Sequence, residues 1–143
     1  ELKKSEVDPK VKRETKALEN TIAKLEREHG RTAVRTASGL KYIVIEYGNG
    51  EKAGKGRDIK AHYSGRLVNG TEFDSSYKRG VPLAFTVGIG RVIKGWDEAL
   101  ADMAKGEKRV LIISPDLGYG AAGHGGVIPP NATLIFEVEM VDF

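Results

Sequence analysis

The polar residues that could carry reaction chemistry are few and widely spaced in this sequence. The three histidines, His29, His62 and His124, are scattered along the chain, and there is no cysteine. Disulfides, cysteine-ligated zinc, iron–sulfur clusters and thiol catalysis are therefore excluded. The spacing of the histidines does not predict a metal site, so we expect neither a metal nor another cofactor.

Two glycine-rich segments match nucleotide-binding motifs only in part. Gly88-Ile89-Gly90 begins like a dinucleotide fingerprint, but the next glycine, Gly95, comes two residues too late. Residues 118–123 have the glycine spacing of a phosphate loop, but His124 stands where the lysine is needed. No Gly-x-Ser-x-Gly nucleophile motif is present. Acid–base, nucleophilic and phosphate-binding chemistry thus have no support in the sequence.

The remaining candidates are aromatic and branched side chains close to predicted loops. They could line an apolar cavity, or they could simply fill a hydrophobic core. They are Tyr63, Phe73, Phe85, Val92, Ile93, Trp96, Tyr119, Ile128 and Phe136.

These side chains must be positioned by a sheet, because most of the chain after Gly39 has the pattern of short strands. Ile59, Ala61 and Tyr63 alternate with polar residues, and Asn69-Gly70 is a strong hairpin signal. Residues 110–113 are apolar throughout, as in a strand buried on both faces. We predict an α+β fold of five or six antiparallel strands with one helix on one face. The predicted strands are 40–47, 59–67, 71–74, 83–87, 110–113 and 134–140.

One short helix interrupts these strands, and two long loops flank it in the sequence. Trp96, Leu100 and Met103 recur at helical spacing, and Gly106 is the predicted C-terminal cap. The loops cover residues 49–57 and 114–131 and are rich in glycine and proline. A loop as long as the second one is usually functional in a compact domain.

The first 35 residues differ in composition from the rest of the chain. They contain ten Lys/Arg and seven Asp/Glu, whereas residues 36–143 contain thirteen of each, so the net charge of +3 lies in this segment. The sequence therefore predicts a charged helical extension, 1–35, and a globular domain, 36–143. So small a charge, without a basic stripe, does not indicate nucleic-acid binding.

The extension contains a predicted helix over residues 9–29, with Asp8 as N-cap and Gly30 as terminator. Its apolar residues form a narrow stripe, which suits light docking on a domain or pairing with a second helix. A solvated, partly frayed helix is the other reading. The stripe consists of Val11, Leu18, Ile22 and Leu25.

Several short motifs follow one another in unbroken order between about Ser38 and Phe143. They are Ala61-His62-Tyr63-Ser64-Gly65, Asn69-Gly70, Phe73-Asp74-Ser75-Ser76, Val92-Ile93-Lys94-Gly95-Trp96, Met103-Ala104-Lys105-Gly106, Ile113-Ser114-Pro115, Tyr119-Gly120, Gly123-His124-Gly125-Gly126 and Val127-Ile128-Pro129-Pro130-Asn131-Ala132-Thr133-Leu134. Each motif is weak alone, but their joint order resembles the FKBP-type peptidyl-prolyl cis-trans isomerases.

The resemblance implies a twisted antiparallel sheet wrapped around one short helix, here preceded by the N-terminal helix. It also implies an apolar active-site cavity floored by Trp96. Catalytic contributions are implied for Asp74, Tyr119, Phe136, Trp96 and Tyr63. Substrate contacts are implied for Phe73, Leu83, Val92, Ile93, Ile128, Arg79, His124 and Phe85.

Several details of the cavity follow from the same resemblance. Asp74 can pair with Tyr63 or Arg79, Tyr119 would donate from its hydroxyl, and the main-chain N–H groups of Ile93 and Ile128 are candidate donors. Leu83 departs from a phenylalanine often found in the family, so one wall is expected to be less aromatic. Gly125 stands where some members have proline.

The implied activity is rotation about Xaa-Pro bonds, which assists protein folding and needs no reactive group. The implied partners are proline-containing peptides, unfolded proteins and macrolide immunosuppressants. Two alternatives are a proline-binding or chaperone module with little turnover, and a homodimeric scaffold joined through residues 9–29. No segment is apolar enough for a membrane span. The compartment stays open between the cytoplasm and, if a leader preceded Glu1, the periplasm.

Overall fold

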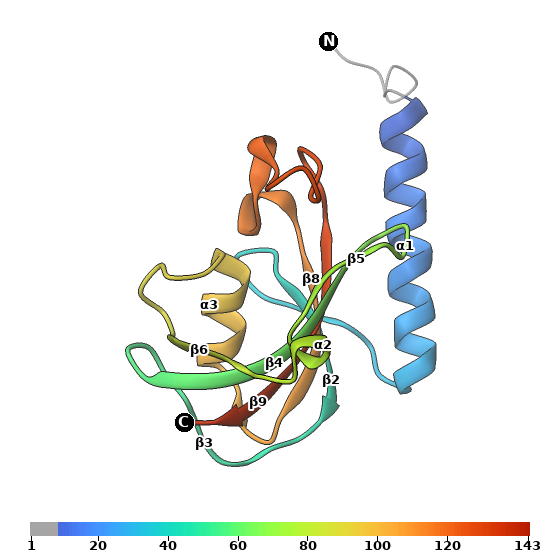
Figure 1. The fold of residues 1–143 in the computed structure, drawn as a ribbon. Coiled ribbons are helices and arrows are strands. Elements are labelled where there is room, and N and C mark those ends of the chain that lie inside the picture. The colour runs from blue at the N-terminus through green and yellow to red at the C-terminus, as the bar shows by residue number, and fades with distance from the viewer. Residues whose placement is uncertain (1–8) are drawn as a thin grey trace.

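A seven-stranded antiparallel sheet forms the body of the computed structural model, which describes residues 9–143 (Figure 1). The strand order is β1-β2-β8-β9-β4-β5, and β6 also pairs with β4. A second small sheet pairs β3 with β7. The strands are β1 (Val34–Arg35), β2 (Lys41–Glu46), β3 (Asn49–Lys52), β4 (Asp58–Leu67), β5 (Glu72–Ser75), β6 (Leu83–Thr86), β7 (Ala104–Lys105), β8 (Lys108–Ile113) and β9 (Leu134–Asp142).

The sheet curves around α3 (Lys94–Ala101), and the main core lies between them (Figure 1). Trp96 and Leu100 of α3 are buried in this core. The alternation in β4 has the predicted effect, because Ile59, Ala61 and Tyr63 all face it. The predicted architecture, a twisted antiparallel sheet around one short helix, is confirmed.

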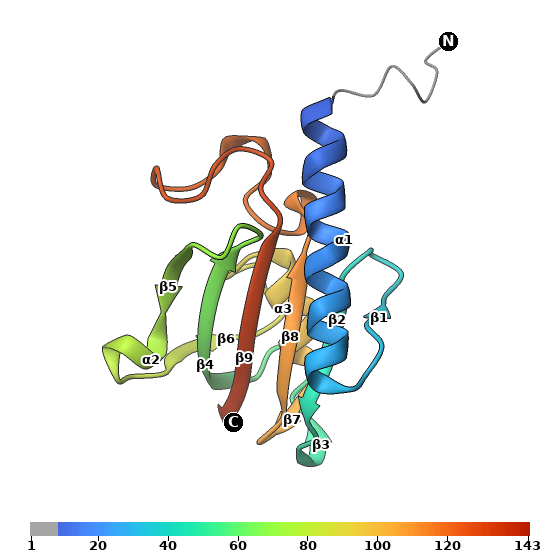
Figure 2. The same cartoon turned by 90° about the vertical axis from the view of Figure 1, so that its right-hand side faces the viewer.

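α1 (Pro9–His29) lies on the outer face of the sheet over β2 and β8, whereas β4 and β5 stay uncovered, as Figure 2 shows. Leu18, Ile22 and Leu25 of α1 pack against a second cluster of buried residues on this face, and Leu25 is itself buried. The sheet contributes Ile43, Val110, Ile112 and Ile135. The narrow apolar stripe therefore docks on the domain, which is one of the arrangements its spacing predicted.

The first turns of α1 extend past the end of the sheet, and Val11 remains 48% exposed there. The predicted N-cap, Asp8, lies outside the described residues. Within residues 9–143, no helix has the length and apolar character needed to cross a membrane.

The predicted end of the second helix was wrong. α3 ends at Ala101, where the N–H groups of Asp102 and Met103 bond to carbonyls three residues back, Ala99 and Leu100. Met103 continues the apolar spacing and is fully buried, but it follows the helix in a tightened turn. β7 comes next, and Gly106, with a φ of 85°, lies in the turn to β8 rather than at the helix end.

The two predicted loops contain more regular structure than expected. β3 occupies residues 49–52, and two short 3-10 helices, Pro115–Leu117 and Gly120–Ala122, lie in the longer loop. A single helical turn, α2 (Ser76–Arg79), follows β5 and was not predicted. It is too short to show a hydrophobic period, but it matters for the site below.

Candidate active site

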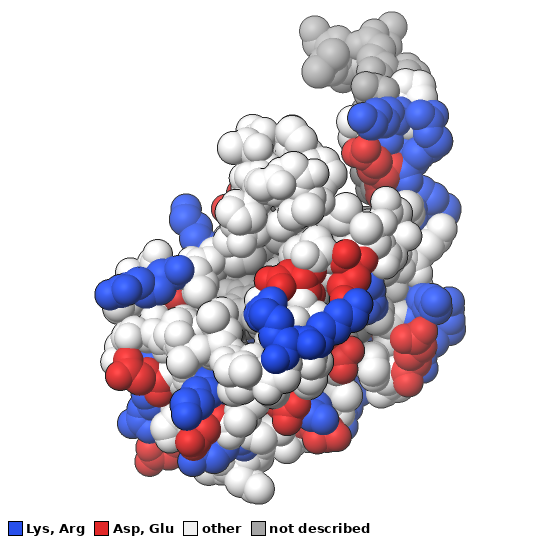
Figure 3. Space-filling view, in the orientation of Figure 1, with Lys and Arg blue, Asp and Glu red and all other residues white. Residues whose placement is uncertain are grey.

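A cavity of about 380 Å³ opens on the inner side of the sheet, beside the N-terminal end of α3. This volume lies within the range typical of small-molecule sites. Figure 3 shows that few charges surround the hollow, whereas basic and acidic side chains gather over α2 and β5. The cavity is lined by Tyr63, Phe73, Asp74, Leu83, Arg91, Val92, Ile93, Trp96, Tyr119, His124, Val127, Ile128 and Phe136.

The aromatic side chains of the cavity are held by edge-to-face contacts around Trp96. The ring centroids of Tyr63 and Phe136 lie 4.8 and 5.2 Å from that of Trp96, with interplanar angles of 77° and 81°. Phe73 packs in the same manner on Phe136, at 5.5 Å. Such perpendicular pairs are favoured by the ring quadrupoles, so each ring fixes its neighbour. The result is a rigid apolar floor rather than a loose set of rings.

Gly65 of β4 allows two of these rings to approach the sheet. A Cβ atom built on Gly65 would lie 2.6 Å from Phe136 and 2.7 Å from Phe73, closer than real side chains come. Strand residue 65 therefore has to be glycine for the two phenylalanines to keep their places.

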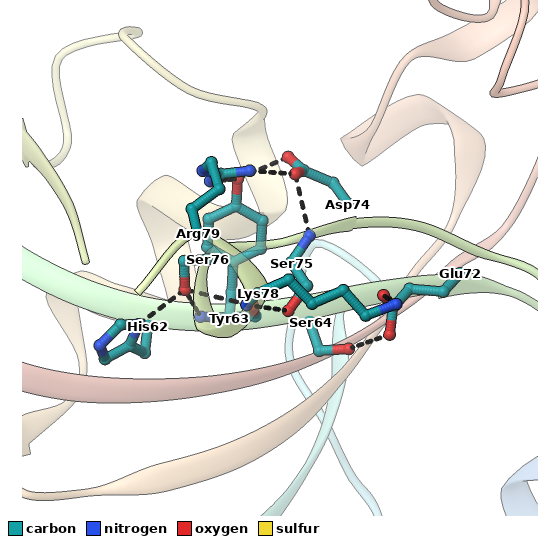
Figure 4. Close-up of polar contacts among 9 residues, drawn as sticks. All are labelled: His62, Tyr63, Ser64, Glu72, Asp74, Ser75, Ser76, Lys78 and Arg79. Carbon is teal, nitrogen blue, oxygen red and sulfur yellow. Dashed lines mark hydrogen bonds and ion pairs between the residues drawn. The ribbon is translucent and has the colours of Figure 1, made fainter. Parts of the chain in front are cut away.

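The polar rim is a closed triangle of hydrogen bonds on one side of the cavity (Figure 4). The Tyr63 hydroxyl donates to Oδ2 of Asp74 at 2.5 Å and accepts from Nη2 of Arg79 at 2.7 Å. Arg79 also donates from Nη1 to Oδ1 of Asp74 at 2.5 Å. Asp74 thus makes both of the alternative pairings expected from the sequence.

The triangle holds its members in one protonation state. Burial favours the neutral form of Asp74, but the hydrogen bonds from Tyr63 and Arg79 and the charge of Arg79 outweigh it, so the pKa of Asp74 falls below its usual value. Burial, reinforced by the hydrogen bond to Asp74, raises the pKa of the Tyr63 hydroxyl. The carboxylate therefore stays ionised and the phenol stays protonated.

α2 brings Arg79 to this triangle. The Ser75 side chain caps the turn by accepting from the Lys78 N–H at 3.4 Å. The buried Ser76 hydroxyl accepts from the Tyr63 N–H at 2.7 Å and lies 2.8 Å from Nδ1 of His62 (Figure 4). The turn is therefore fastened to β4 directly behind Tyr63.

The opposite side of the cavity is formed by the long loop. The rings of Tyr119 and His124 stack with centroids 4.5 Å apart. Burial, with a smaller effect of the Asp74 charge, raises the pKa of the Tyr119 hydroxyl and keeps it protonated. The structure gives this hydroxyl no partner among the described residues, so it is available as a donor to a ligand.

The two candidate main-chain donors differ in availability. The Ile128 N–H donates to the His124 carbonyl at 3.0 Å, so it is already used inside the loop. The Ile93 N–H has no protein partner among the described residues, although its carbonyl accepts from Trp96 and Asp97. Of the two candidates, only the Ile93 N–H is therefore left without a main-chain acceptor among the described residues.

Two residues that were expected to touch substrate do not line the cavity. Arg79 reaches it only through Asp74 and Tyr63. Phe85 packs beneath Trp96, with ring centroids 6.0 Å apart, and lines a separate shallow hollow beside β6 with Phe143. Each of them contacts a residue that does face the cavity.

Two lining residues were missed by the sequence reasoning. Arg91 and Val127 both line the cavity, and each is adjacent in sequence to a predicted residue, Val92 and Ile128. Adjacency to a predicted residue was the only sequence signal for them. Arg91 is charged and Val127 is 55% exposed, and neither property is typical of a residue that lines an apolar cavity. Within residues 9–143, no group of three or more His, Asp or Glu is arranged to hold a metal ion.

Comparison with known proteins agrees with this fold. Residues 49–141 match the family described as FKBP-type peptidyl-prolyl cis-trans isomerase. FK506-binding protein 1 of Dictyostelium discoideum is 55% identical over 105 residues, covering 73% of this chain and 98% of that protein. The peptidyl-prolyl cis-trans isomerase of Schizosaccharomyces pombe is 50% identical over 104 residues, covering 72% and 93%.

Solved structures show the same fold. The crystal structure of AtFKBP13 has a TM-score of 0.73 and 44% identity, covering 76% of this chain and 96% of that one. FkpA from Escherichia coli has a TM-score of 0.76 and 44% identity, covering 90% of this chain and 58% of that one. The chain therefore belongs to the FKBP family of peptidyl-prolyl cis-trans isomerases, rotamases that act in protein folding, as the order of its motifs predicted.

Proposed function

We propose that the cavity around Trp96 receives the proline ring of a peptide and catalyses rotation about the preceding amide without forming a covalent bond. The observation that carries this proposal is the apolar floor of Trp96, Tyr63 and Phe136, held by perpendicular ring contacts. A proline ring is compact, apolar and without an N–H, so it can pack on such a floor without leaving a polar group unpaired.

The reaction needs stabilisation of a twisted amide rather than a reactive group. Planar amide resonance separates charge and imposes a barrier of ~18–20 kcal/mol. Twisting breaks that resonance and reduces the charge separation, so an apolar cavity stabilises the twisted form relative to the planar one. A rate gain of ~10⁵-fold corresponds to about 7 kcal/mol. Shape, exclusion of water and one or two hydrogen bonds together can supply this.

The polar groups at the rim orient the substrate. We assign the Tyr119 hydroxyl and the Ile93 N–H as donors to substrate carbonyls, because neither has a hydrogen-bond partner within residues 9–143. Asp74 lines the same cavity, and its ionised state is maintained by Tyr63 and Arg79. A hydrogen bond from the next residue's N–H to the prolyl nitrogen would further assist, because that nitrogen becomes pyramidal.

A protease-coupled isomerisation assay on a Xaa-Pro peptide tests this function. The full chain should accelerate cis-to-trans exchange, and Phe136→Ala should lower kcat/KM by at least about tenfold. Phe143→Ala is the matched control, since this phenylalanine lies in the hollow beside β6 and not in the cavity. Unchanged kcat/KM in a folded Phe136→Ala variant would contradict the site assignment.

The rival function is a proline-binding or chaperone module with little turnover. An exposed apolar side chain in the cavity wall favours it, because Val127 is 55% exposed there. The same assay separates the two, because a binding module would bind the peptide without accelerating exchange.

We also propose that the cavity binds macrolides of the type named in its relatives, the FK506-binding proteins. The cavity is large enough for part of such a ligand and offers Tyr119 and Ile93 as donors. Leu83 forms a wall without an aromatic ring. FK506 should compete with a Xaa-Pro peptide, and a lack of competition would restrict the cavity to peptides.

We also propose, as an alternative role of the extension, that two chains form a homodimer through residues 9–29. Leu18, Ile22 and Leu25 are directed at the sheet, so Val11 is the member of the stripe left exposed. Analytical ultracentrifugation of the chain with and without residues 1–35 measures the oligomeric state directly. A dimer that persists without these residues would assign the contact elsewhere.

A further inference from the structure

The loop between β6 and α3 carries three residues of the cavity wall, Arg91, Val92 and Ile93. Its residues form turns and bends without regular structure. Main-chain bonds fasten its two ends: Val87 exchanges bonds with Arg57 and Gly56, and the Ile93 carbonyl accepts from the first turn of α3. The middle of the loop needs a different anchor.

Asp97 in the first turn of α3 is that anchor. Its Oδ1 accepts from the Gly88 N–H at 2.8 Å and its Oδ2 from the Gly90 N–H at 2.9 Å. Each carboxylate oxygen thus serves one amide, and the two bonds span the exposed Ile89. A negative charge is also favoured at this end of a helix.

The two amides point to one carboxylate because of an unusual backbone. Gly88 and Gly90 have φ angles of 84° and 81°, a region that glycine adopts freely and other residues avoid. This conformation turns both N–H groups toward α3. Val92 and Ile93 pack against the core, but no other hydrogen bond holds residues 88–91 within the described part of the chain, so without Asp97 these residues would exchange among several conformations.

We propose that Asp97 is a positioning residue for the isomerase site, holding the 88–93 segment so that Val92 and the Ile93 N–H stay at the cavity. Asp97 itself does not line the cavity. It is adjacent in sequence to Trp96, so the helix turn that supplies the floor also fixes the wall. The inference rests on the proposed function, because it assigns Ile93 as a substrate donor.

A graded series of substitutions follows from the two bonds. Asp97→Ala removes both acceptors. Asp97→Asn keeps the size and one acceptor oxygen but places an NH₂ donor against the second amide. A mobile loop must be ordered when substrate binds, so the cost falls on binding and raises KM more than it lowers kcat. KM should increase about tenfold in Asp97→Ala and by a smaller factor in Asp97→Asn.

Glu98 provides the matched control. It is the next residue of the same helix turn, and its carboxylate accepts from the Ser38 hydroxyl, away from the loop. Glu98→Ala should leave KM within about twofold of the full-chain value, whatever it does to the melting temperature.

The experiment measures kcat and KM for a Xaa-Pro peptide, together with hydrogen exchange of the Gly88 and Gly90 amides, in the full chain and the three variants. The inference is supported if Asp97→Ala shows faster exchange at both amides together with a raised KM. Glu98→Ala should show neither change. If Asp97→Ala does not fold, Asp97→Asn decides, with exchange accelerated at one amide and an intermediate KM.

An unchanged KM in a folded Asp97 variant overturns the inference, even if its melting temperature falls, because the residue would then be merely structural. Unchanged amide exchange overturns it as well. An inactive unsubstituted chain would instead contradict the proposed function, so the two failures are distinguishable.

Discussion

The Tyr63 hydroxyl donates to the Asp74 carboxylate at 2.5 Å, and this bond ties the rim of the cavity to its floor. The Tyr63 ring packs edge to face against Trp96, so the position of the carboxylate depends on the position of the indole. Arg79, bonded to both, completes the connection from outside the cavity. Polar and aromatic parts of the site therefore form one unit.

This connection predicts coupled effects of two substitutions. Asp74→Leu and Tyr63→Phe should each lower kcat/KM by about tenfold, because each removes the hydrogen bond between the Tyr63 hydroxyl and the Asp74 carboxylate. The double variant should lose much less than the product of the two, since both changes break the same bond. Kinetics of the full double-mutant cycle measure this. Losses that multiply would show that the two residues act independently.

The pH dependence of activity follows from the two pKa shifts. The pKa of Asp74 is lowered and that of Tyr63 is raised, so neither group changes its charge between about pH 5 and about pH 9. We expect a flat kcat/KM across this range when it is measured by NMR exchange. His124→Gln is the background for the measurement, because it removes the histidine that lines the cavity.

The lowered pKa of Asp74 also fixes the direction in which stability and activity change at acidic pH. Because the pKa of Asp74 is depressed in the folded chain, its contribution to stability is complete above the unfolded value of about 3.9. That contribution is lost as pH falls through the lower folded value. A decline in kcat/KM already at about pH 6 in the His124→Gln background would contradict the assignment.

Gly65→Ala should damage the cavity while the sheet persists. The added methyl would meet Phe136 at 2.6 Å and Phe73 at 2.7 Å, so both rings must shift. We expect kcat/KM to fall by about tenfold or more, with destabilisation of about 1–3 kcal/mol from overpacking.

Ser64→Ala is the control for this substitution. Ser64 is the neighbouring residue of β4 and bonds to Glu72, on the other side of the strand. Its removal should leave kcat/KM unchanged. Wild-type activity in Gly65→Ala would mean that the rings have more freedom than their perpendicular contacts indicate.

Leu25→Ala should lower stability and spare activity. Leu25 is buried against the outer face of the sheet, far from the cavity side, so its truncation should cost about 2 kcal/mol or somewhat more. Thermal unfolding measures the loss, and kcat/KM below the transition should not change. Lys24→Ala, at a 71% exposed side chain, is the control. Equal melting temperatures for both variants would show that α1 is undocked in solution.

The boundary predicted at residue 36 can be tested in the same way. A chain of residues 36–143 should retain isomerase activity but unfold at lower temperature, since it lacks α1 and also β1, which pairs with Lys41 and Tyr42. Loss of activity in a folded short chain would assign α1 a role in the site.

The residues that the sequence predicted well are those with a strong local pattern. Ile59, Ala61 and Tyr63 alternate over a long strand, and residues 110–113 are apolar throughout, so their burial could be predicted. The cavity residues came from the order of motifs, because a buried phenylalanine looks the same in a core and in a pocket.

Other features depended on tertiary contacts that leave no local pattern. Arg79 belongs to the site through a one-turn helix fastened by Ser76 to β4, and Gly106 caps no helix because Met103 is drawn into the core by a tightened turn. The role of Asp97 could not be predicted for the same reason, because the Gly88 and Gly90 amides come close to it only when their loop folds back on α3.

β8 and β9 lie between two hydrophobic clusters, and consecutive residues of these strands belong to opposite clusters. Ile112 faces α1 on one side, whereas Ile113 faces the core beneath the cavity on the other. Substitutions can therefore accumulate on one side of these strands without altering packing on the other. The segment that covers the outer face can be exchanged during evolution for a different one, while the catalytic side of the same strands stays the same.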